Sequence, residues 1–298
     1  MPFMAGQGTG DRAALTAAVL LTGAVMLLEV AGGYLSGSLA LLSDAGHMLR
    51  DVLALLLSLG AVIIAERLPT KTRTFGYHRV EVLVAFVNGL LLIVLAGAIL
   101  WEAAQRLSAP VAVGGTVMGA VGAVGLAANI GVAYILHGRD DLNVRSAFLH
   151  VVGDTLSSVA VIAAALWIAL TGQTFVDPLL SGAIAVVILA SSYPLLRETV
   201  AVLLQYTPAG LDFDKVVGAI EGVEGVESVH NVHLWSLCSH INILDAHVVT
   251  CASDCAAVEA IKREIRRRLL AFDVKYSTLE FEAEPCPGCG ELCRIEAE

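Results

Sequence analysis

The first 237 residues of this 298-residue chain contain no cysteine, and only 15% of all residues are charged. The missing cysteines exclude a disulfide framework from most of the chain. Soluble domains carry about 25% charged residues, so the shortage of charge excludes an ordinary water-soluble fold for the whole chain. Instead, 57% of the residues are hydrophobic and the mean hydropathy is +0.77, which indicates a membrane protein.

Basic residues are also scarce, and the imbalance is concentrated at one end of the chain. Residues 1–208 carry 12 acidic and 10 basic side chains, whereas residues 209–298 carry 16 and 8. An acidic surface argues against nucleic acid as a partner and favours cations. We expect a membrane domain at 1–208, a soluble domain at 209–285 and a cysteine-containing tail at 286–298.

Six apolar runs are long enough to cross a lipid bilayer, because a helical span needs about 20 apolar residues. Lys and Arg gather in the segments that follow the second and fourth runs, so the positive-inside rule places these segments and both termini in the cytosol. We expect a multi-pass protein, located in the inner cell membrane if the source is bacterial. The runs cover roughly 13–35, 39–65, 80–104, 111–137, 145–171 and 177–197.

The acidic end of the chain alternates between amphipathic helices and strands. The predicted order is helix, strand, strand, helix, strand. The fold class is therefore a six-helix, all-α membrane domain followed by a cytosolic α+β domain of ferredoxin-like or metallochaperone-like α-β-β-α-β order. All six cysteines lie in this cytosolic part, where thiol or metal chemistry is expected rather than disulfides.

Two similar phrases, HMLRD at His47–Asp51 and HVVGD at His150–Asp154, lie inside the second and fifth apolar runs. Residues four apart share one face of a helix, so each phrase offers one imidazole nitrogen and one carboxylate oxygen. Two such helices facing each other would supply the ligands of a tetrahedral divalent metal, with Zn²⁺ the first choice. The predicted metal site is His47, Asp51, His150 and Asp154.

Charge balance predicts exchange of metal for protons at this site. Two carboxylates are neutralised by one Zn²⁺ or by two protonated imidazoles, whereas an empty site costs about 2.5–3.5 kcal/mol or more per buried charge. Bound metal requires neutral imidazole, so protons and metal displace each other. The alternative is that each His and Asp hydrogen-bonds a neighbouring helix and only holds the bundle together. Glu29 and Asp44 are further intramembrane carboxylates without an assigned role.

The sequence resembles the cation diffusion facilitator family of zinc transporters over nearly its whole length. Three segments carry the resemblance: GSLALLSDAGHMLRDVLALLLSL, FGYHRVEVL and NVRSAFLHVVGDTLSSVAVI. It implies a homodimer and a secondary active transporter, not an enzyme, that exports Zn²⁺ in exchange for protons by alternating access. The implied transport site is again His47, Asp51, His150 and Asp154. Some bacterial relatives pair a cation before the third span with an Asp after the sixth, where this chain has Arg79 and Gln205.

The resemblance also implies cytosolic metal sites, since family members bind regulatory zinc in the tail. His230 and His247 fit that pattern best, with Glu282 as a carboxylate partner. The segment CPGCGELC adds Cys286 and Cys289, because a CxxC pair suits a soft metal. His78 in the basic loop is a further candidate ligand. Solvated imidazoles and free thiols remain the alternatives for all of these residues.

Three other functions fit part of the pattern. A broader exporter of Cd²⁺, Co²⁺, Fe²⁺ or Mn²⁺ fits because ligand chemistry biases metal selectivity without fixing it. A membrane metalloenzyme would activate water, but it needs a general base such as the Glu of HExxH, and the sequence has no such motif. A metal sensor that signals through its tail would leave ligands near the bilayer midplane unexplained.

Overall fold

The structure is a computed structural model that describes residues 9–65, 69–136, 142–252, 254–284 and 290–292. Within its helices, the side chains of residues 9–19, 51, 54–65, 135–136 and 142–152 lie outside the description. The chain divides into two compact units. The first comprises residues 1–59 and 87–194 and holds most of the apolar helices, and the second comprises residues 60–86 and 195–298 and holds the sheet.

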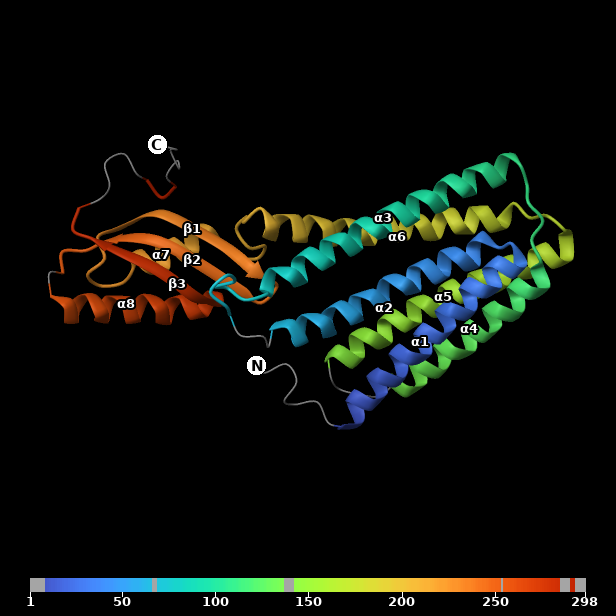
Figure 1. The fold of residues 1–298 in the computed structure, drawn as a ribbon, viewed down its shortest axis with the longest axis horizontal. Coiled ribbons are helices and arrows are strands. Elements are labelled where there is room, and N and C mark those ends of the chain that lie inside the picture. Colours follow the sequence, from blue (N-terminus) through green and yellow to red (C-terminus); the bar gives the residue numbers. More distant parts are fainter. Residues whose placement is uncertain (1–8, 66–68, 137–141, 253, 285–289, 293–298) are drawn as a thin grey trace. The chain divides into compact units, whose positions relative to one another are not determined.

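Six long helices follow one another through the first 203 residues (Figure 1). Four of them, from the third to the sixth, have described stretches long and apolar enough to cross a membrane. The first contributes a shorter apolar stretch, Leu20–Ser36. The helices are α1 (Thr9–Ser36), α2 (Leu39–Ala65), α3 (His78–Ser108), α4 (Gly115–Leu136), α5 (Leu142–Thr171) and α6 (Val176–Leu203).

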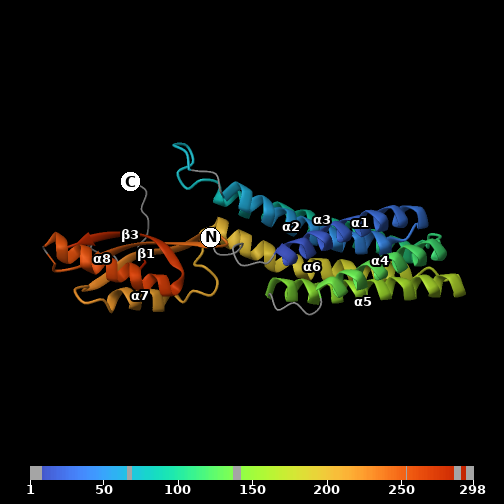
Figure 2. The same ribbon diagram turned by 90° about the horizontal axis from the view of Figure 1, so that it is seen from below.

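Small residues allow close packing of α4 against α1 on one side and α5 on the other (Figures 1 and 2). A methyl group added to Gly32 of α1 would lie 2.6 Å from the Val121 side chain of α4. One added to Gly115 of α4 would lie 2.9 Å from the Ala165 carbonyl oxygen of α5. Packing of backbones through small residues is the usual way in which apolar helices associate inside a bilayer.

Helix α2 takes part in both buried clusters of the membrane bundle. Leu39 packs with Leu92 of α3 and Ile188 of α6, while Leu41 packs with helices α4 and α5, where it meets Met118 and Val161. All six side chains are buried. The helix that carries His47 is therefore held from both sides.

The start of α2 is capped by a residue far away in the sequence. The Asp177 carboxylate of α6 accepts hydrogen bonds from the backbone N–H groups of Leu39 and Ala40, at 2.9 and 3.1 Å, and from the Ser38 hydroxyl at 2.6 Å. The first N–H groups of a helix have no partner within it, and a negative charge there also complements the helix dipole. Arg106 of α3 lies 3.8 Å from the same carboxylate. Asp177 thus fixes the position of α2 against α3 and α6.

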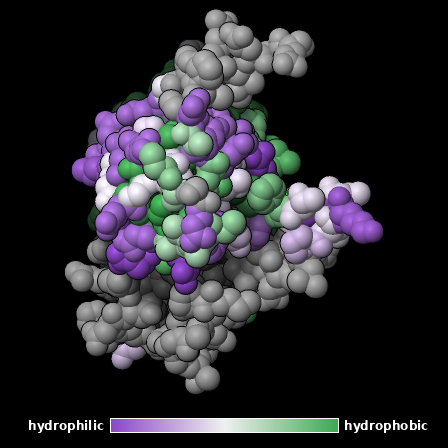
Figure 3. All heavy atoms as spheres, turned by 90° about the vertical axis from the view of Figure 1, so that its left-hand side faces the viewer, coloured by the Kyte–Doolittle hydropathy of each residue, from purple (hydrophilic) through white to green (hydrophobic). Residues whose placement is uncertain are grey.

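The second unit contains a three-stranded sheet with β2 in the centre, antiparallel to β1 and parallel to β3. Ile220 and Ile265, from its two helices, pack with Leu244 of β2 in one buried core. The α-β-β-α-β order is confirmed. In Figure 3, hydrophilic side chains surround smaller apolar patches on the visible face of this unit. Its elements are α7 (Phe213–Glu221), β1 (Ser228–Cys238), β2 (Ile241–Val249), α8 (Cys255–Leu269), the 3₁₀ turn η1 (Leu270–Phe272) and β3 (Val274–Glu282).

Candidate functional site

His47 of α2 and Asp154 of α5 approach each other within the helical unit. The His47 Nε2 atom lies 3.6 Å from Oδ1 of Asp154, and the two side chains are only 17% and 9% exposed. This separation is long for a hydrogen bond but short for electrostatic attraction. The structure therefore brings together one residue from each HxxxD phrase.

The other two predicted ligands, Asp51 and His150, have side chains that lie outside the described residues. Their backbone positions belong to α2 and α5, which run in opposite directions (Figure 1). Asp51 lies one helical turn after His47 in α2, and His150 lies one turn before Asp154 in α5. Because the helices are antiparallel, Asp51 and His150 lie at the same level along them. Helix periodicity and the observed contact together favour a single cluster of four.

A second polar contact joins the same two helices. The Ser157 hydroxyl of α5 donates a hydrogen bond of 2.6 Å to Oδ1 of Asp44, which is buried on α2 one turn before His47. A further hydrogen bond joins α4 to α5, where the Asn129 amide donates to the Ser158 hydroxyl at 3.2 Å. The sequence reasoning missed Asn129, Ser157 and Ser158. Their only signal is a polar side chain in an apolar helix.

Glu29 of α1 adds a further buried carboxylate to this region. It is 1% exposed and interacts electrostatically with both Asp44 and Asp154. Its Oε2 atom has no hydrogen-bond partner within the described part of the chain. A methyl group on Gly125 of α4 would come within 2.8 Å of Oε1, so the absence of a side chain there makes room for the carboxylate. Acidic side chains from α1, α2 and α5 therefore lie in one region, and those of Asp44 and Asp154 interact with His47.

A second cluster lies on the sheet and takes one residue from each strand. Ligand atoms of His230 on β1, His247 on β2 and Glu282 on β3 all lie within 4.8 Å of one another. His230 and His247 are register partners, with ring centroids 5.2 Å apart. His247 Nδ1 lies 2.7 Å from Oε1 of Glu282. The predicted grouping of these three residues is what the structure shows.

Hydrogen bonds close only part of this cluster: His247 contacts the Asn231 amide at 3.1 Å and Glu282 at 2.7 Å. His230 Nε2 lies 3.1 Å from Oε2 of Glu282, yet both atoms lack an aligned hydrogen-bond partner among the described residues. His230 is 3% exposed, so water does not readily replace such a partner. Two imidazoles and a carboxylate are suitable ligands for Zn²⁺. A cation between these atoms would satisfy the lone pairs that protein groups leave open.

Residues 290 and 291 form backbone hydrogen bonds with strand β1 beside this cluster. The Gly290 and Glu291 carbonyl oxygens accept hydrogen bonds from the backbone N–H groups of Asn231 and Val232, at 3.1 and 2.8 Å. Asn231 has a positive φ of 50° at the β1 irregularity that directly follows His230. Cys286 and Cys289 lie outside the described residues, so their role as ligands stays a prediction. The anchored residue Gly290 directly follows Cys289.

His78, Cys238 and Cys251 do not belong to either cluster. His78 is the first residue of α3 and does not belong to the only group of three or more possible ligands that the described residues contain. The exposed thiol of Cys251 donates to the Glu227 carboxylate, which raises the pKa of Cys251. Burial raises the pKa of the Cys238 thiol. Neither thiol belongs to a cluster of three or more possible ligands among the described residues.

Comparison with known protein families gives a match for both the membrane part and the C-terminal part of the chain. Residues 15–204 match the family described as cation efflux transmembrane domain, and residues 208–282 match the cation efflux protein cytoplasmic domain. The chain belongs to the cation efflux family. The predicted resemblance to cation diffusion facilitators is thereby confirmed, as is a role in membrane efflux of metal cations.

Several cation efflux proteins are similar to this chain over nearly their full length. The zinc transporter ZitB of Pectobacterium atrosepticum is 41% identical over 284 residues, which cover 93% of this chain and 88% of the relative. The cadmium, cobalt and zinc/H(+)-K(+) antiporter of Bacillus subtilis is 37% identical over 283 residues, covering 93% and 91%. The metal cation efflux system protein CzcD of Cupriavidus metallidurans is 39% identical over 280 residues, covering 93% and 88%.

Proposed function

We propose that this protein exports Zn²⁺ from the cytosol in exchange for protons, with His47, Asp51, His150 and Asp154 as the transport site. The observation that carries the proposal is the 3.6 Å approach of His47 on α2 to Asp154 on α5. A lone HxxxD phrase supplies two ligands, which is too few for tight binding of Zn²⁺. Two phrases on facing helices supply four.

Exchange follows from the charges of these ligands. The substrate cation binds to neutral imidazoles and two carboxylates, so it competes with protons for the same atoms. Both the metal-loaded and the protonated site are close to neutral, whereas the empty site holds uncompensated charge in an apolar surrounding. The transporter therefore changes conformation most readily with one or the other bound, which is the condition for alternating access.

Polar contacts beside the ligands join the helices of the proposed site to one another and to α6. The Ser157 to Asp44 hydrogen bond ties α5 to α2 beside the ligands, and the Asp177 cap ties α2 to α6. Asp44 lies one turn before His47 and interacts electrostatically with it. A cation that enters from the cytosol is attracted toward the paired phrases rather than to the apolar walls.

A broader metal range is the second candidate. The relative from Bacillus subtilis is named for cadmium and cobalt as well as zinc, whereas the ZitB proteins are named for zinc. In the family that the sequence resembles, His rather than Asp at the position of His47 is associated with a preference for zinc over cadmium. Imidazole and carboxylate ligands bind Co²⁺ and Cd²⁺ as well, so selectivity depends on site geometry rather than on ligand type alone.

The proposal extends to assembly and orientation. We infer a homodimer in the cell membrane, the inner one in a bacterium, with both termini in the cytosol. The match of residues 208–282 to a cytoplasmic domain supports this orientation. We further propose that His230, His247 and Glu282 bind a regulatory Zn²⁺, with Cys286 and Cys289 as additional ligands. The open lone pairs of His230 and Glu282 support that site.

The test is transport by the full chain in sealed liposomes, with internal metal and internal pH recorded together. We expect Zn²⁺ uptake that is accelerated by an opposing proton gradient and accompanied by proton movement the other way. Cd²⁺, Co²⁺ and Mn²⁺ are compared at the same concentration, and Zn²⁺ is expected to move fastest. Equal Zn²⁺ uptake without a pH gradient and without proton movement would contradict the exchange.

A further inference from the structure

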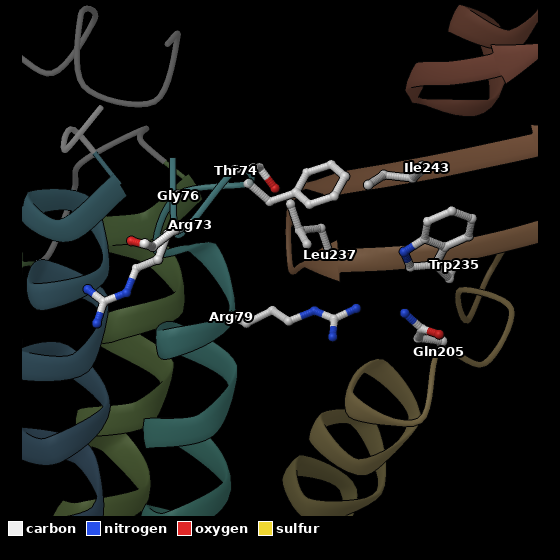
Figure 4. Close-up of a pocket in the computed structure, with 10 residues that line it drawn as sticks. Arg73, Thr74, Gly76, Arg79, Gln205, Trp235, Leu237 and Ile243 are labelled. Atoms are coloured by element: carbon white, nitrogen blue, oxygen red, sulfur yellow. The ribbon is translucent and has the colours of Figure 1, made fainter. Parts of the chain in front are cut away.

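A pocket in the second unit is bounded by hydrogen-bond donors and apolar side chains. Its volume is about 370 Å³, and it lies between the loop before α3, the end of α6 and strands β1 and β2 (Figure 4). No Asp or Glu is among its lining residues, all of which belong to the described part of the chain. This is unusual for a domain in which acidic residues outnumber basic ones. The pocket therefore suits an anion.

Three donors from separate elements face this space. Figure 4 shows the Arg79 guanidinium of α3 extending toward the Gln205 amide, with the Trp235 indole of β1 beside them. An indole N–H and a guanidinium can only donate, and an amide NH₂ donates as well. Within the described residues Arg79 is exposed and forms no ion pair. Its positive charge is available to a ligand.

Nearby charged groups are occupied elsewhere. The Arg73 guanidinium lies over the Tyr77 ring, 4.4 Å from its centroid, and in Figure 4 it points away from Gln205. Glu81, two residues after Arg79, accepts a hydrogen bond of 3.1 Å from Ser239 and does not line the pocket. Of the two arginines among the described lining residues, Arg79 is the one whose guanidinium extends toward Gln205 and Trp235.

Gln205 occupies its position with a strained backbone. Its φ is +58°, in the left-handed region that glycine usually fills at the end of a helix. The Gln205 N–H bonds the Val202 carbonyl and the Tyr206 N–H bonds the Ala201 carbonyl, which is the hydrogen-bond pattern of a helix end of this kind. Non-glycine residues with such a backbone are enriched at binding sites, so the Gln205 side chain is a candidate ligand-binding group.

The apolar part of the lining points to a lipid rather than a small soluble anion. Phe75 is 59% exposed, and Leu237 and Ile243 form the wall beside Trp235. The pocket lies where the membrane helix α3 begins and α6 ends, and the adjacent Leu83 of α3 and Leu204 are 52% and 58% exposed. Basic pockets at such helix ends bind phospholipid headgroups.

We propose that this pocket binds the headgroup phosphate of an anionic phospholipid. Arg79 neutralises the single charge of the phosphodiester, and Gln205 and Trp235 donate to its oxygens. The acyl chains extend along the exposed apolar side chains of α3 and Leu204. The site is distinct from both metal clusters, and lipid binding is independent of whether Zn²⁺ is the transported ion.

Native mass spectrometry of the full-length protein, with added phosphatidylglycerol or phosphatidylcholine, tests this site. We expect phosphatidylglycerol to bind more tightly, and Arg79→Gln to weaken it about tenfold, because a charge-assisted hydrogen bond is lost. Lys71→Gln is the matched control, since Lys71 is an exposed cation of the loop before α3 and does not line the pocket. Equal weakening in both variants, or none in Arg79→Gln, would overturn the proposal.

A second variant keeps the test independent of the loss of Arg79. Gln205→Glu places a carboxylate beside the guanidinium, so it should form an ion pair there and exclude the phosphate. Thermal unfolding of each variant verifies that it is folded. Inorganic phosphate and glycerol 3-phosphate identify the source of the anion: both should compete only weakly with the lipid. If inorganic phosphate displaces the lipid completely at equal concentration, or if Gln205→Glu binds phosphatidylglycerol normally, the lipid site is wrong.

Discussion

The imidazole of His47 on α2 lies 3.6 Å from the carboxylate of Asp154 on α5, so the two HxxxD phrases meet between antiparallel helices. Each phrase is one helical turn long. The contact of His47 with Asp154 therefore places Asp51 and His150 opposite each other one turn further along the two helices. The bilayer tolerates these polar groups when a bound cation or protons neutralise them. The contact therefore links the repeated sequence pattern to a transport mechanism.

Replacement of Asp177 should destabilise the membrane bundle. Asp177→Ala removes the acceptor for two backbone N–H groups and the Ser38 hydroxyl at the start of α2. Each buried donor left without a partner costs about 1–3 kcal/mol, so we expect a loss of about 3 kcal/mol or more and a clearly lower Tm in detergent. Asp177→Asn retains an acceptor oxygen and should lose less. Equal Tm for wild type and Asp177→Ala would show that the cap does not hold α2.

A methyl group on α4 should disturb the transport region only where it meets Glu29. Gly125→Ala places a carbon 2.8 Å from the Glu29 carboxylate, which is buried and has little room to shift. Gly119→Ala on the same helix meets only the Ala165 methyl at 3.4 Å, an ordinary contact. We expect a several-fold slower Zn²⁺ uptake for Gly125→Ala and normal uptake for Gly119→Ala. If the two variants transport alike, the position of Glu29 is unimportant.

The sheet cluster should bind zinc independently of the membrane site. Glu282→Gln removes the carboxylate that lies against both imidazoles, so the purified protein should retain one Zn²⁺ fewer per chain in a chelator competition. His233→Ala is the control, since His233 lies on β1 but outside the cluster. Transport should persist in both variants. An unchanged zinc count in Glu282→Gln would refute this site.

Zinc binding at the sheet cluster should also depend on pH. His230 and His247 bind metal only as neutral imidazoles, so protons compete with Zn²⁺ for the same nitrogen atoms. We therefore expect the zinc affinity of the cluster to fall as the pH is lowered from neutral. Glu282→Gln, which lacks the site, supplies the baseline. Zinc affinity that stays constant down to pH 5 would contradict ligation by these imidazoles.

Much of the fold was predictable because it depends on local periodicity. Runs of apolar residues predicted the helices, and alternating patterns predicted the α-β-β-α-β order of the cytosolic unit. The grouping of His230, His247 and Glu282 was also predicted, though from the family resemblance rather than from spacing. The domain boundaries at 208 and 285 stay predictions.

Contacts between distant segments could not be read from the sequence. Asp177 and the start of α2 are separated by 138 positions, and no local pattern indicates that they meet. The Asn129, Ser157 and Asp44 contacts likewise depend on how helices pack. The pairing of Asp51 with His150 remains a prediction from helix periodicity, while the meeting of His47 with Asp154 is observed.

The most direct test is Zn²⁺ uptake by Asp154→Ala in sealed liposomes. The matched control is Glu102→Gln, which neutralises a carboxylate that pairs with Arg106 on α3, away from the paired phrases. We predict that Asp154→Ala takes up no Zn²⁺ above protein-free liposomes and moves no protons, as does Asp51→Ala, while Glu102→Gln transports normally. Uptake by folded Asp154→Ala at the rate of the wild type would contradict a transport site built from the two HxxxD phrases.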